Sequence, residues 1–446
     1  MRRENQLRWR WVHKLLGGKE TDAWVCVGVL LSVLFSPGFV KAQNCDSISV
    51  GLVPINDLGM AFYRGLQGGL YPNGENTRPS SHDDAGLLIS RGIQPLNLDG
   101  IPDSSAGKIV FLSIGMSNTQ QEFGNFKSLA DTFTGRNPYL EIVNGAQGGQ
   151  DIDKIIDSTS MFWRSIERTL GEVGLSNNQV QVIWFKEAEA YPGDDGGDTA
   201  FVPYVTGLKE KFKTAMNITK AEFPNAVLCY IASRIYGGYA TIELNDEPFA
   251  HYTGWADKFL IEDQINGDPG LRYSGPEANS PWLSWGVYLW ADGLVPRSDG
   301  LTWECPGDYQ PDGTHPSDPQ GRAKVANILF EFLVTDATAV PWFLGAGTTS
   351  VSEPLGSSPE TPLRLENYPN PFNSSAIIRY ELLQKSSVTL KVVDCLGREV
   401  QTLVAQTEEA GVHEVSFDGS LFVSGIYFYR LEAGGLVRVG KMILMR

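Results

Sequence analysis

The chain is poor in cysteine and in positive charge, and beyond its first 42 residues it has no apolar run long enough to cross a membrane. Its five cysteines are not spaced as in a metal site, and we expect neither a metal nor a cofactor. Acidic groups outnumber basic ones by 52 to 36, which gives a formal charge of -16. Such a surface repels phosphate backbones and anionic lipids, so no nucleic-acid partner and no peripheral membrane role is expected.

The first 42 residues are typical of a signal peptide. Basic side chains precede an apolar run over residues 23–40, and residues 40–42 read Val-Lys-Ala, which suits a signal peptidase. The run falls short of the ~20 residues of a membrane span. We therefore favour a cleaved signal over the alternative, an uncleaved anchor, and expect no stable membrane span. The remaining chain holds 29 basic and 49 acidic groups, a formal charge of -20.

Composition divides the rest of the chain into two domains. With 42% apolar and 11% aromatic residues, the 446-residue chain can form a large core and a smaller module. Residues 345–362 are mostly Gly, Ser, Thr, Pro and Glu, which cannot build a core and indicate a linker. We therefore expect one domain over residues 43–344 and a second over residues 363–446.

The larger domain alternates between two kinds of pattern. Apolar runs typical of strands buried on both faces occur at residues 108–115, 139–143, 180–185 and 226–231. Helical stretches occur at residues 151–170, 204–223 and 319–334. The alternation predicts an α/β fold with a central parallel sheet flanked by helices. Three tryptophans and a tyrosine are expected in the core, with sugar stacking as the alternative for one of them: Trp282, Trp285, Trp290 and Tyr288.

The second domain consists of short strand-like segments with glycine-containing turns, which predicts a small all-β sandwich. The segments are residues 376–382, 388–394, 412–417, 425–431 and 436–445.

Four motifs in this tail occur in a familiar order: Tyr-Pro-Asn-Pro-Phe-Asn at residues 368–373, then residues 392–400, 424–431 and 441–444. They resemble the C-terminal sorting domain (type A-like) of type IX secretion substrates. The resemblance implies that residues 363–446 bind the type IX secretion machinery of a two-membrane bacterium and that the protein reaches the cell surface or the medium. The alternative is a carbohydrate-binding or spacer sandwich.

Four cysteines lie outside the predicted signal: Cys45, Cys229, Cys305 and Cys395. Cys229 lies in an apolar run and is expected to be a buried thiol. Export permits disulfides, and Cys45 with Cys305 is the pair to test first, although spacing alone does not choose among three full pairings.

The candidate site begins with the hexapeptide at residues 312–317, Asp-Gly-Thr-His-Pro-Ser. An aspartate three residues before a histidine, on a loop with Gly and Pro, allows the carboxylate of Asp312 to hold one imidazole nitrogen of His315. The other nitrogen can then face a nucleophile. This pair forms two thirds of a hydrolytic triad.

Ser117 is the candidate nucleophile. It follows Gly115 at the end of a buried strand, where ligands gather in an open parallel sheet. The alternative is that Ser117 caps the following helix. A glycine-rich turn at residues 144–150 follows the next strand, and its Gly148 can bring a backbone NH to an oxyanion.

Together these residues resemble the SGNH (GDSL-like) hydrolase superfamily in three ordered blocks: Gly115 with Ser117, the turn at residues 144–148, and Asp312 with His315. The resemblance implies a three-layer α/β/α sandwich and esterase-type acyl transfer, often deacetylation of carbohydrate. Ser117 would attack, His315 would carry the proton and Asp312 would orient the ring, with Asn118 as a possible oxyanion helper.

One block departs from the superfamily pattern. Where an Asn or Gln is usual, this chain has Lys186-Glu187. An ionised Glu187 would repel an oxyanion, so the site either loses one donor or keeps Glu187 protonated. Lys186 is a candidate compensating cation.

Our leading hypothesis is a secreted serine esterase that deacylates carbohydrate, with an acylated polysaccharide as the expected substrate. The alternatives are a non-catalytic polysaccharide-binding protein on the same scaffold and a purely structural surface protein. The segment at residues 68–79 is rich in Gly, Asn and Pro and is expected to pack as an ordered loop across the site.

Overall fold

The computed structural model describes residues 44–193, 200–344 and 365–444, the last range without residues 371, 383, 395–397, 424, 434 and 435. The predicted signal peptide (1–42), the predicted linker (345–362) and Cys395 therefore lie outside the described residues.

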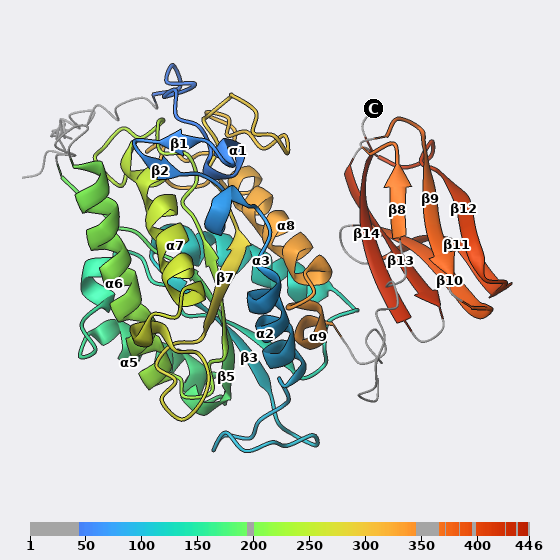
Figure 1. Cartoon of the computed structure of the whole chain (residues 1–446), viewed down its shortest axis with the longest axis horizontal. Coiled ribbons are helices and arrows are strands. Elements are labelled where there is room, and N and C mark those ends of the chain that lie inside the picture. The colour runs from blue at the N-terminus through green and yellow to red at the C-terminus, as the bar shows by residue number, and fades with distance from the viewer. Residues whose placement is uncertain are drawn as a thin grey trace, which may run out of the picture. The chain divides into compact units, whose positions relative to one another are not determined.

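A parallel sheet of five strands forms the centre of the larger domain, in the order β4-β3-β5-β6-β7. Strands β3, β5 and β7 of this sheet are labelled in Figure 1. The strands are β3 (Ile109–Gly115), β4 (Leu140–Asn144), β5 (Val180–Lys186), β6 (Leu228–Ala232) and β7 (Trp282–Val287). Every residue of β3, β5 and β6 is buried, as continuous apolar runs predict. Because the chain moves from β3 to β4 on one side and then to β5 on the other, the strand order reverses at β3. Ligand sites favour the carboxyl ends of strands at such a reversal.

Nine α-helices are described along this domain. They are α1 (Ile55–Leu58), α2 (Ser80–Arg91), α3 (Ser117–Thr132), α4 (Ile152–Ile155), α5 (Met161–Glu172), α6 (Phe201–Glu222), α7 (Phe249–Ile265), α8 (Gln320–Thr335) and α9 (Val340–Phe343). Helix α3 packs on α8, and α6 packs on α7. A two-stranded hairpin, β1 (Phe62–Tyr63) and β2 (Leu66–Gln67), precedes α2.

The prediction of one helix over residues 151–170 is wrong, because polar side chains interrupt it. The carboxylate of Asp157 accepts hydrogen bonds from the backbone NH and the hydroxyl of Thr159, at 2.8 and 2.7 Å. The hydroxyl of Ser160 then caps α5 by accepting from the NH of Phe162. Such side-chain bonds compete with the helical pattern, so α4 ends at Ile155 and α5 begins at Met161.

The C-terminal region is all-β, with antiparallel sheets in the orders β11-β10-β13-β14 and β12-β9-β8. Its strands are β8 (Leu365–Tyr368), β9 (Ser375–Leu382), β10 (Ser386–Asp394), β11 (Glu399–Glu408), β12 (Gly411–Asp418), β13 (Gly425–Ala433) and β14 (Leu436–Leu444). Buried residues alternate along β9 and over the first seven positions of β10, and both strands contribute to one hydrophobic core. The predicted all-β character of the tail is confirmed.

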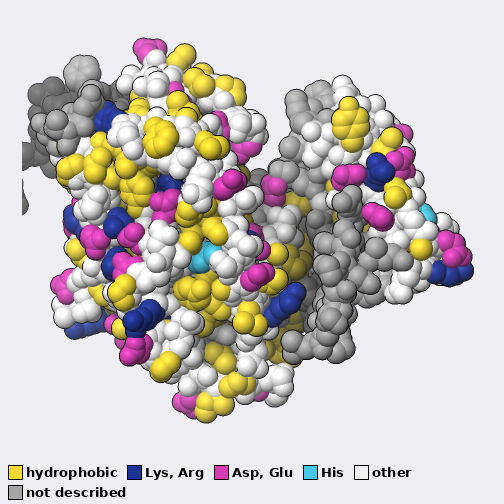
Figure 2. Space-filling model, in the orientation of Figure 1, with side chains coloured by type: hydrophobic (Ala, Val, Ile, Leu, Met, Phe, Trp, Pro, Cys, Tyr) yellow, Lys and Arg dark blue, Asp and Glu magenta, His cyan; other side chains and the backbone are white. Residues whose placement is uncertain are grey.

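The surface view shows basic side chains scattered among acidic and hydrophobic ones on the visible face of the larger domain (Figure 2). Within the described ranges, no helix is both long enough and apolar enough to cross a membrane.

The start of the described chain is attached at two points. Cys45 is bonded to Cys305 with their Cα atoms 5.2 Å apart, so the pairing chosen for testing is confirmed. The carboxylate of Asp292 accepts from the Ser49 hydroxyl at 2.5 Å and from the Val50 NH at 2.8 Å. Cys229 is a free, buried thiol, as predicted, and burial raises its pKa.

We expect the Cys45→Ser/Cys305→Ser double variant to lose about 2–4 kcal/mol of unfolding free energy, because the bond closes a loop between residues 260 positions apart. Thermal unfolding with and without dithiothreitol measures this loss. The reductant should lower the Tm of the wild type to that of the double variant and leave the variant unchanged. An equal effect of the reductant on both proteins would contradict the prediction.

Candidate functional site

Ser117 stands at the start of α3, directly after a tight turn from β3. The turn requires glycine at position 115, because a Cβ there would lie 2.3 Å from the carbonyl oxygen of Lys186 and 2.4 Å from the Thr119 hydroxyl. Met116 occupies the N-cap position, and the Ser117 hydroxyl bonds a histidine instead of the helix backbone. The alternative that Ser117 serves as the helix cap is therefore wrong.

Ser117, His315 and Asp312 form a continuous hydrogen-bonded chain. The Ser117 Oγ lies 2.7 Å from the Nε2 of His315, and the Nδ1 of His315 lies 2.5 Å from the Oδ2 of Asp312. Partial burial of Asp312 opposes its ionisation, but the hydrogen bonds from the His315 ring and from backbone NH groups outweigh it and lower the pKa of Asp312 to about 2. Asp312 is therefore ionised at neutral pH.

The loop that carries Asp312 and His315 is fixed by bonds within itself and to α3. The Oδ1 of Asp312 accepts from the backbone NH groups of Thr314 and His315, both at 3.0 Å. Gly313 has a φ of +68° and is so close to Tyr239 that a Cβ would lie 1.7 Å from the Tyr239 carbonyl oxygen. The buried amide of Asn118 donates to the Thr314 carbonyl at 3.0 Å. Asn118 thus ties the loop to the helix that carries Ser117, a different task from the oxyanion contact suggested by the sequence.

Gly148 lies beside Ser117. An idealised Cβ on Gly148 would be 3.9 Å from the Cβ of Ser117, and nothing else but Gln120 comes as close. The turn is held to the end of β3 because the NH of Gln147 donates to the carbonyl of Gly115 at 2.9 Å. Gly148 itself is exposed, so its backbone is accessible next to the serine.

Lys186 is held by an ion pair with Glu122, and this pair conflicts with its expected role as a cation that stabilises the oxyanion. Its side chain is 1% exposed and its ammonium is paired with the buried carboxylate of Glu122 on α3. Burial lowers the pKa of Lys186 to about 8, although Glu122 opposes this shift. The ammonium lies in the interface between β5 and α3, so we do not retain Lys186 as an oxyanion helper.

Glu187 follows β5 and is buried. One carboxyl oxygen accepts from the NH of Ala188 at 3.1 Å, and the other has no hydrogen-bond partner among the residues that the structure describes. Burial raises the pKa of Glu187 well above its usual range, and Asp151 raises it further, while the Ala188 NH and Arg234 act in the opposite direction. The neutral form of Glu187 is therefore favoured, which is the condition under which this side chain can donate a hydrogen bond.

Arg234, a buried arginine two residues after β6, was not predicted from the sequence. Its Nε donates to Asn245 at 2.9 Å, and its Nη1 has no partner within the described ranges. Burial lowers the pKa of Arg234, and the carboxylate of Glu122 opposes this shift. The signal that identified Ser117, a polar side chain just after a buried strand, also applies to Arg234.

Within the part of the chain that the structure describes, no group of three or more His, Cys, Asp or Glu side chains is arranged to hold a metal ion.

Comparison with known proteins identifies the tail. Residues 366–445 match the model of the secretion system C-terminal sorting domain, so the chain ends in a type IX sorting domain. This domain implies interaction with the secretion machinery, secretion and attachment at the cell surface. A search of curated proteins found no significant match.

Three solved structures are similar to parts of the chain. Latent PorU from Porphyromonas gingivalis is 22% identical over 20% of this chain and 10% of its own, with a TM-score of 0.17. A protein from Arabidopsis thaliana is 12% identical over 47% of this chain and 66% of its own, with a TM-score of 0.25. A gut microbial diltiazem-metabolizing enzyme is 12% identical over 72% of this chain and 63% of its own, with a TM-score of 0.28. This chain thus spans less than two thirds of each, and these TM-scores are too low to support an argument about function.

The two glycines beside Ser117 should respond differently to alanine. We expect Gly115→Ala to lose about 1–3 kcal/mol of stability, because its methyl group would overlap the carbonyl oxygen of Lys186 in β5 and the side chain of Thr119. Gly148→Ala is the matched control, since its methyl group would meet its nearest neighbour at 3.7 Å, an ordinary contact. Thermal unfolding compares the two variants, and equal Tm values would contradict the prediction.

Proposed function

We propose that the α/β domain is a serine ester hydrolase with Ser117 as nucleophile, His315 as general acid and base, and Asp312 as the residue that orients the imidazole. The observation that carries the proposal is the chain of short contacts, 2.7 Å from serine to histidine and 2.5 Å from histidine to aspartate. A serine needs an adjacent base to become nucleophilic, and the base needs a partner that sets its tautomer.

In the proposed reaction, the Ser117 oxygen attacks the acyl carbon while its proton passes to the Nε2 of His315. The tetrahedral intermediate collapses, the bond to the alcohol oxygen breaks, and His315 returns the proton to that oxygen. Water then attacks the acyl-enzyme with His315 as base, and the acid is released with Ser117 restored. Asp312, ionised throughout, stabilises the imidazolium that forms in each half of the reaction.

For the oxyanion we propose three donors. The NH of Ser117 is in the first turn of α3, where backbone NH groups have no partner within the helix. The NH of Gly148 belongs to the turn beside the serine. Neutral Glu187 takes the position of the usual amide as the third donor, because β5 pairs Lys186 with Gly115 and so brings the residues that follow them to one edge of the sheet.

We further propose that the substrate is an acylated polysaccharide, with acetyl as the expected acyl group. The enzyme would meet this substrate outside the cell, because the sorting domain directs the protein there. The SGNH resemblance supports an ester rather than another acyl compound.

Two helix pairs, α3 with α8 and α6 with α7, support the finer proposal of a three-layer α/β/α sandwich. The core shared by the two C-terminal sheets supports a β-sandwich for the tail.

Ser117→Ala should lower the hydrolysis of p-nitrophenyl acetate by at least ~10³-fold, because it removes the nucleophile. Ser128→Ala is the matched control, since Ser128 lies on the exposed side of the same helix and donates to the Gly124 carbonyl at 3.0 Å. A fluorophosphonate probe should label the wild type and the control at Ser117. If Ser117→Ala hydrolyses the ester like the wild type, the serine is not the nucleophile. If the wild type neither hydrolyses the ester nor reacts with the probe, a binding function on this scaffold becomes the better hypothesis.

Glu187→Gln should keep activity within about tenfold, because an amide replaces a neutral carboxyl as donor. The raised pKa of Glu187 also predicts a stability effect: the folded state retains a proton that the unfolded chain releases above about pH 4.5, so the wild type loses stability as pH rises. The Tm of Glu187→Gln relative to the wild type should therefore increase from pH 4 to pH 8.

The control for this effect is Glu172→Gln at the exposed end of α5, whose Tm relative to the wild type should be the same at both pH values. A Glu187→Gln variant that is inactive, or that loses relative stability as pH rises, would rule out the neutral donor.

A further inference from the structure

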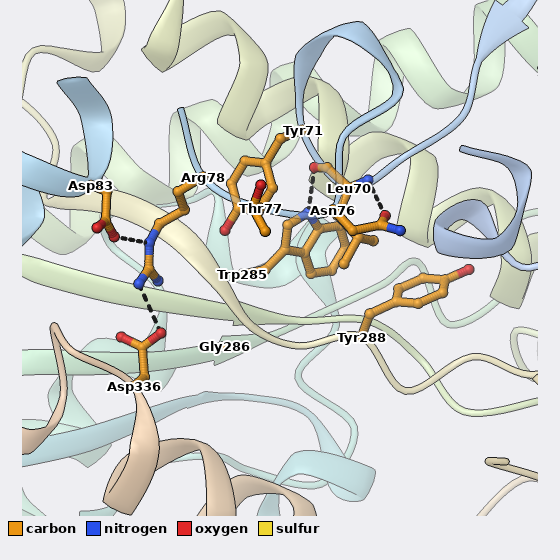
Figure 3. A pocket seen from close by; sticks show the side chains of 10 residues that line it. All are labelled: Leu70, Tyr71, Asn76, Thr77, Arg78, Asp83, Trp285, Gly286, Tyr288 and Asp336. Atoms are coloured by element: carbon orange, nitrogen blue, oxygen red, sulfur yellow. Dashed lines mark hydrogen bonds and ion pairs between the residues drawn. The ribbon is translucent and has the colours of Figure 1, made fainter. Parts of the chain in front are cut away.

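The segment expected to cover Ser117, residues 68–79, packs along β7 instead. The indole NH of Trp285 donates to the Leu70 carbonyl at 2.8 Å, and this bond is drawn in Figure 3. Strands β3, β5 and β6 separate β7 from β4, which places β7 ~19 Å from the strand that leads into the turn at residues 147–150. Other groups must therefore hold this turn beside the serine.

The base of the turn is anchored, whereas its tip is exposed. At the base, the NH of Gln147 donates to the Gly115 carbonyl at 2.9 Å, and the NH of Gln150 donates to the Gln147 carbonyl at 3.3 Å. At the tip, Gly148 and Gly149 are exposed, and an idealised Cβ on Gly149 would have no neighbour within 4 Å among the described residues. Glycine brings no side chain to pack, so the tip depends on hydrogen bonds for its position.

Lys154 supplies such a bond. It lies on α4, and its ammonium donates to the Gly149 carbonyl. The same ammonium is 3.6 Å from the Oδ1 of Asp151, the N-cap residue of that helix. Two oxygen atoms thus fix the position of the ammonium, although the lysine side chain is 55% exposed.

Helix α4 is itself bonded to the segment that follows β5 and carries Glu187. The NH of Ile152 donates to the Ala188 carbonyl at 3.1 Å, and the carboxylate of Asp151 accepts from the Ala190 NH at 3.2 Å. Through α4, the lysine therefore connects the turn after β4 with the segment after β5, and each of these carries one of the proposed oxyanion donors.

An oxyanion donor is effective only when it is held close to its productive position. Donors lie ~2.7–3.1 Å from the oxyanion, and catalytic groups need to be fixed within ~0.5 Å. Gly148 precedes Gly149 in the chain, so a movement of the tip would also displace the NH of Gly148 from its place beside Ser117.

We propose that Lys154 is a positioning residue, which fixes the tip of the turn and thereby the NH of Gly148 beside Ser117. This inference rests on the proposed hydrolase function. Removal of one oxyanion donor lowers turnover by ~10²–10³. Loss of the bond that holds a donor leaves the donor itself in the site, so we expect a smaller effect of about tenfold.

Lys154→Met tests the proposal, because it removes the ammonium and keeps most of the length of the side chain. We expect its kcat/KM for p-nitrophenyl acetate to fall about tenfold, whereas Lys154→Arg, which keeps a cationic donor, should stay within about threefold of the wild type. Lys127→Met is the matched control and should react like the wild type, since the Lys127 side chain is 41% exposed and pairs with Asp131 within α3.

Ethylboronic acid gives a readout that belongs to the oxyanion site. The Ser117 oxygen adds to boron and its proton passes to His315, which leaves a tetrahedral anion with one oxygen at the oxyanion position. In Lys154→Met, the inhibition constant should rise by the factor by which kcat/KM falls. Lys154→Gln replaces this variant if its Tm shows that it does not fold.

Salt separates the position of the ammonium from its charge. The loss in Lys154→Met should persist at 1 M NaCl, where the Debye length is ~3 Å. A wild type that slows to the rate of Lys154→Met at this salt concentration would show that the charge alone acts and would overturn the proposal. So would a Lys154→Arg variant as slow as Lys154→Met.

The two proposals fail in different ways. An active wild type together with a Lys154→Met variant that hydrolyses the ester and binds the boronic acid equally well overturns the positioning role alone. A wild type that neither hydrolyses the ester nor binds the boronic acid overturns the proposed hydrolase, and the positioning role with it.

Discussion

The carboxylate of Asp312 is the group on which the candidate site depends. One of its oxygens accepts two backbone NH groups and closes the loop, and the other accepts the Nδ1 of His315. The same side chain therefore both holds the loop and orients the imidazole. Asn118 connects this loop to α3, which fixes the loop relative to the serine. The contact between Ser117 and His315 joins residues 198 positions apart, and the bond from Asn118 helps to hold these two residues together.

The sequence was sufficient to predict the parts of the fold that have a simple pattern. Buried strands are continuous apolar runs, and β3, β4, β5 and β6 were found for that reason. Strand β7 was missed because its tryptophans, serine and glycine resemble aromatic core rather than a strand. Helix α7 was missed because it is buried almost all round and includes His251, Asp257 and Lys258 among its buried residues, so no amphipathic period marks it.

The same distinction applies to the site. Ser117 could be predicted from its place at a strand end, and Asp312 with His315 from their three-residue spacing. The direction of Lys186 could not, because it depends on Glu122, a residue 64 positions away on α3. The sequence indicated that Glu187 can donate a hydrogen bond only if it is protonated. It did not predict whether Glu187 is protonated, because burial is a property of the folded chain. Arg234 carries only the signal of a polar residue just after a buried strand, and the position of β6 next to β5 in the sheet brings it near Glu187.

Burying ionisable groups near the carboxyl ends of the sheet strands costs free energy of folding. Pairing Lys186 with Glu122 recovers part of the cost of removing both from water, yet such pairs rarely stabilise a fold more than apolar residues would. The cost also falls on Glu187, Arg234 and Asp257, and each of these three, like Glu122, keeps at least one buried polar atom without a partner among the described residues. Costs of this kind concentrate at functional sites. Since Glu187 and Arg234 follow β5 and β6 as Ser117 follows β3, the least stabilising side chains and the proposed nucleophile lie along one edge. A scaffold maintained only for structure would be more stable with apolar residues there, and this favours a chemical role for the edge.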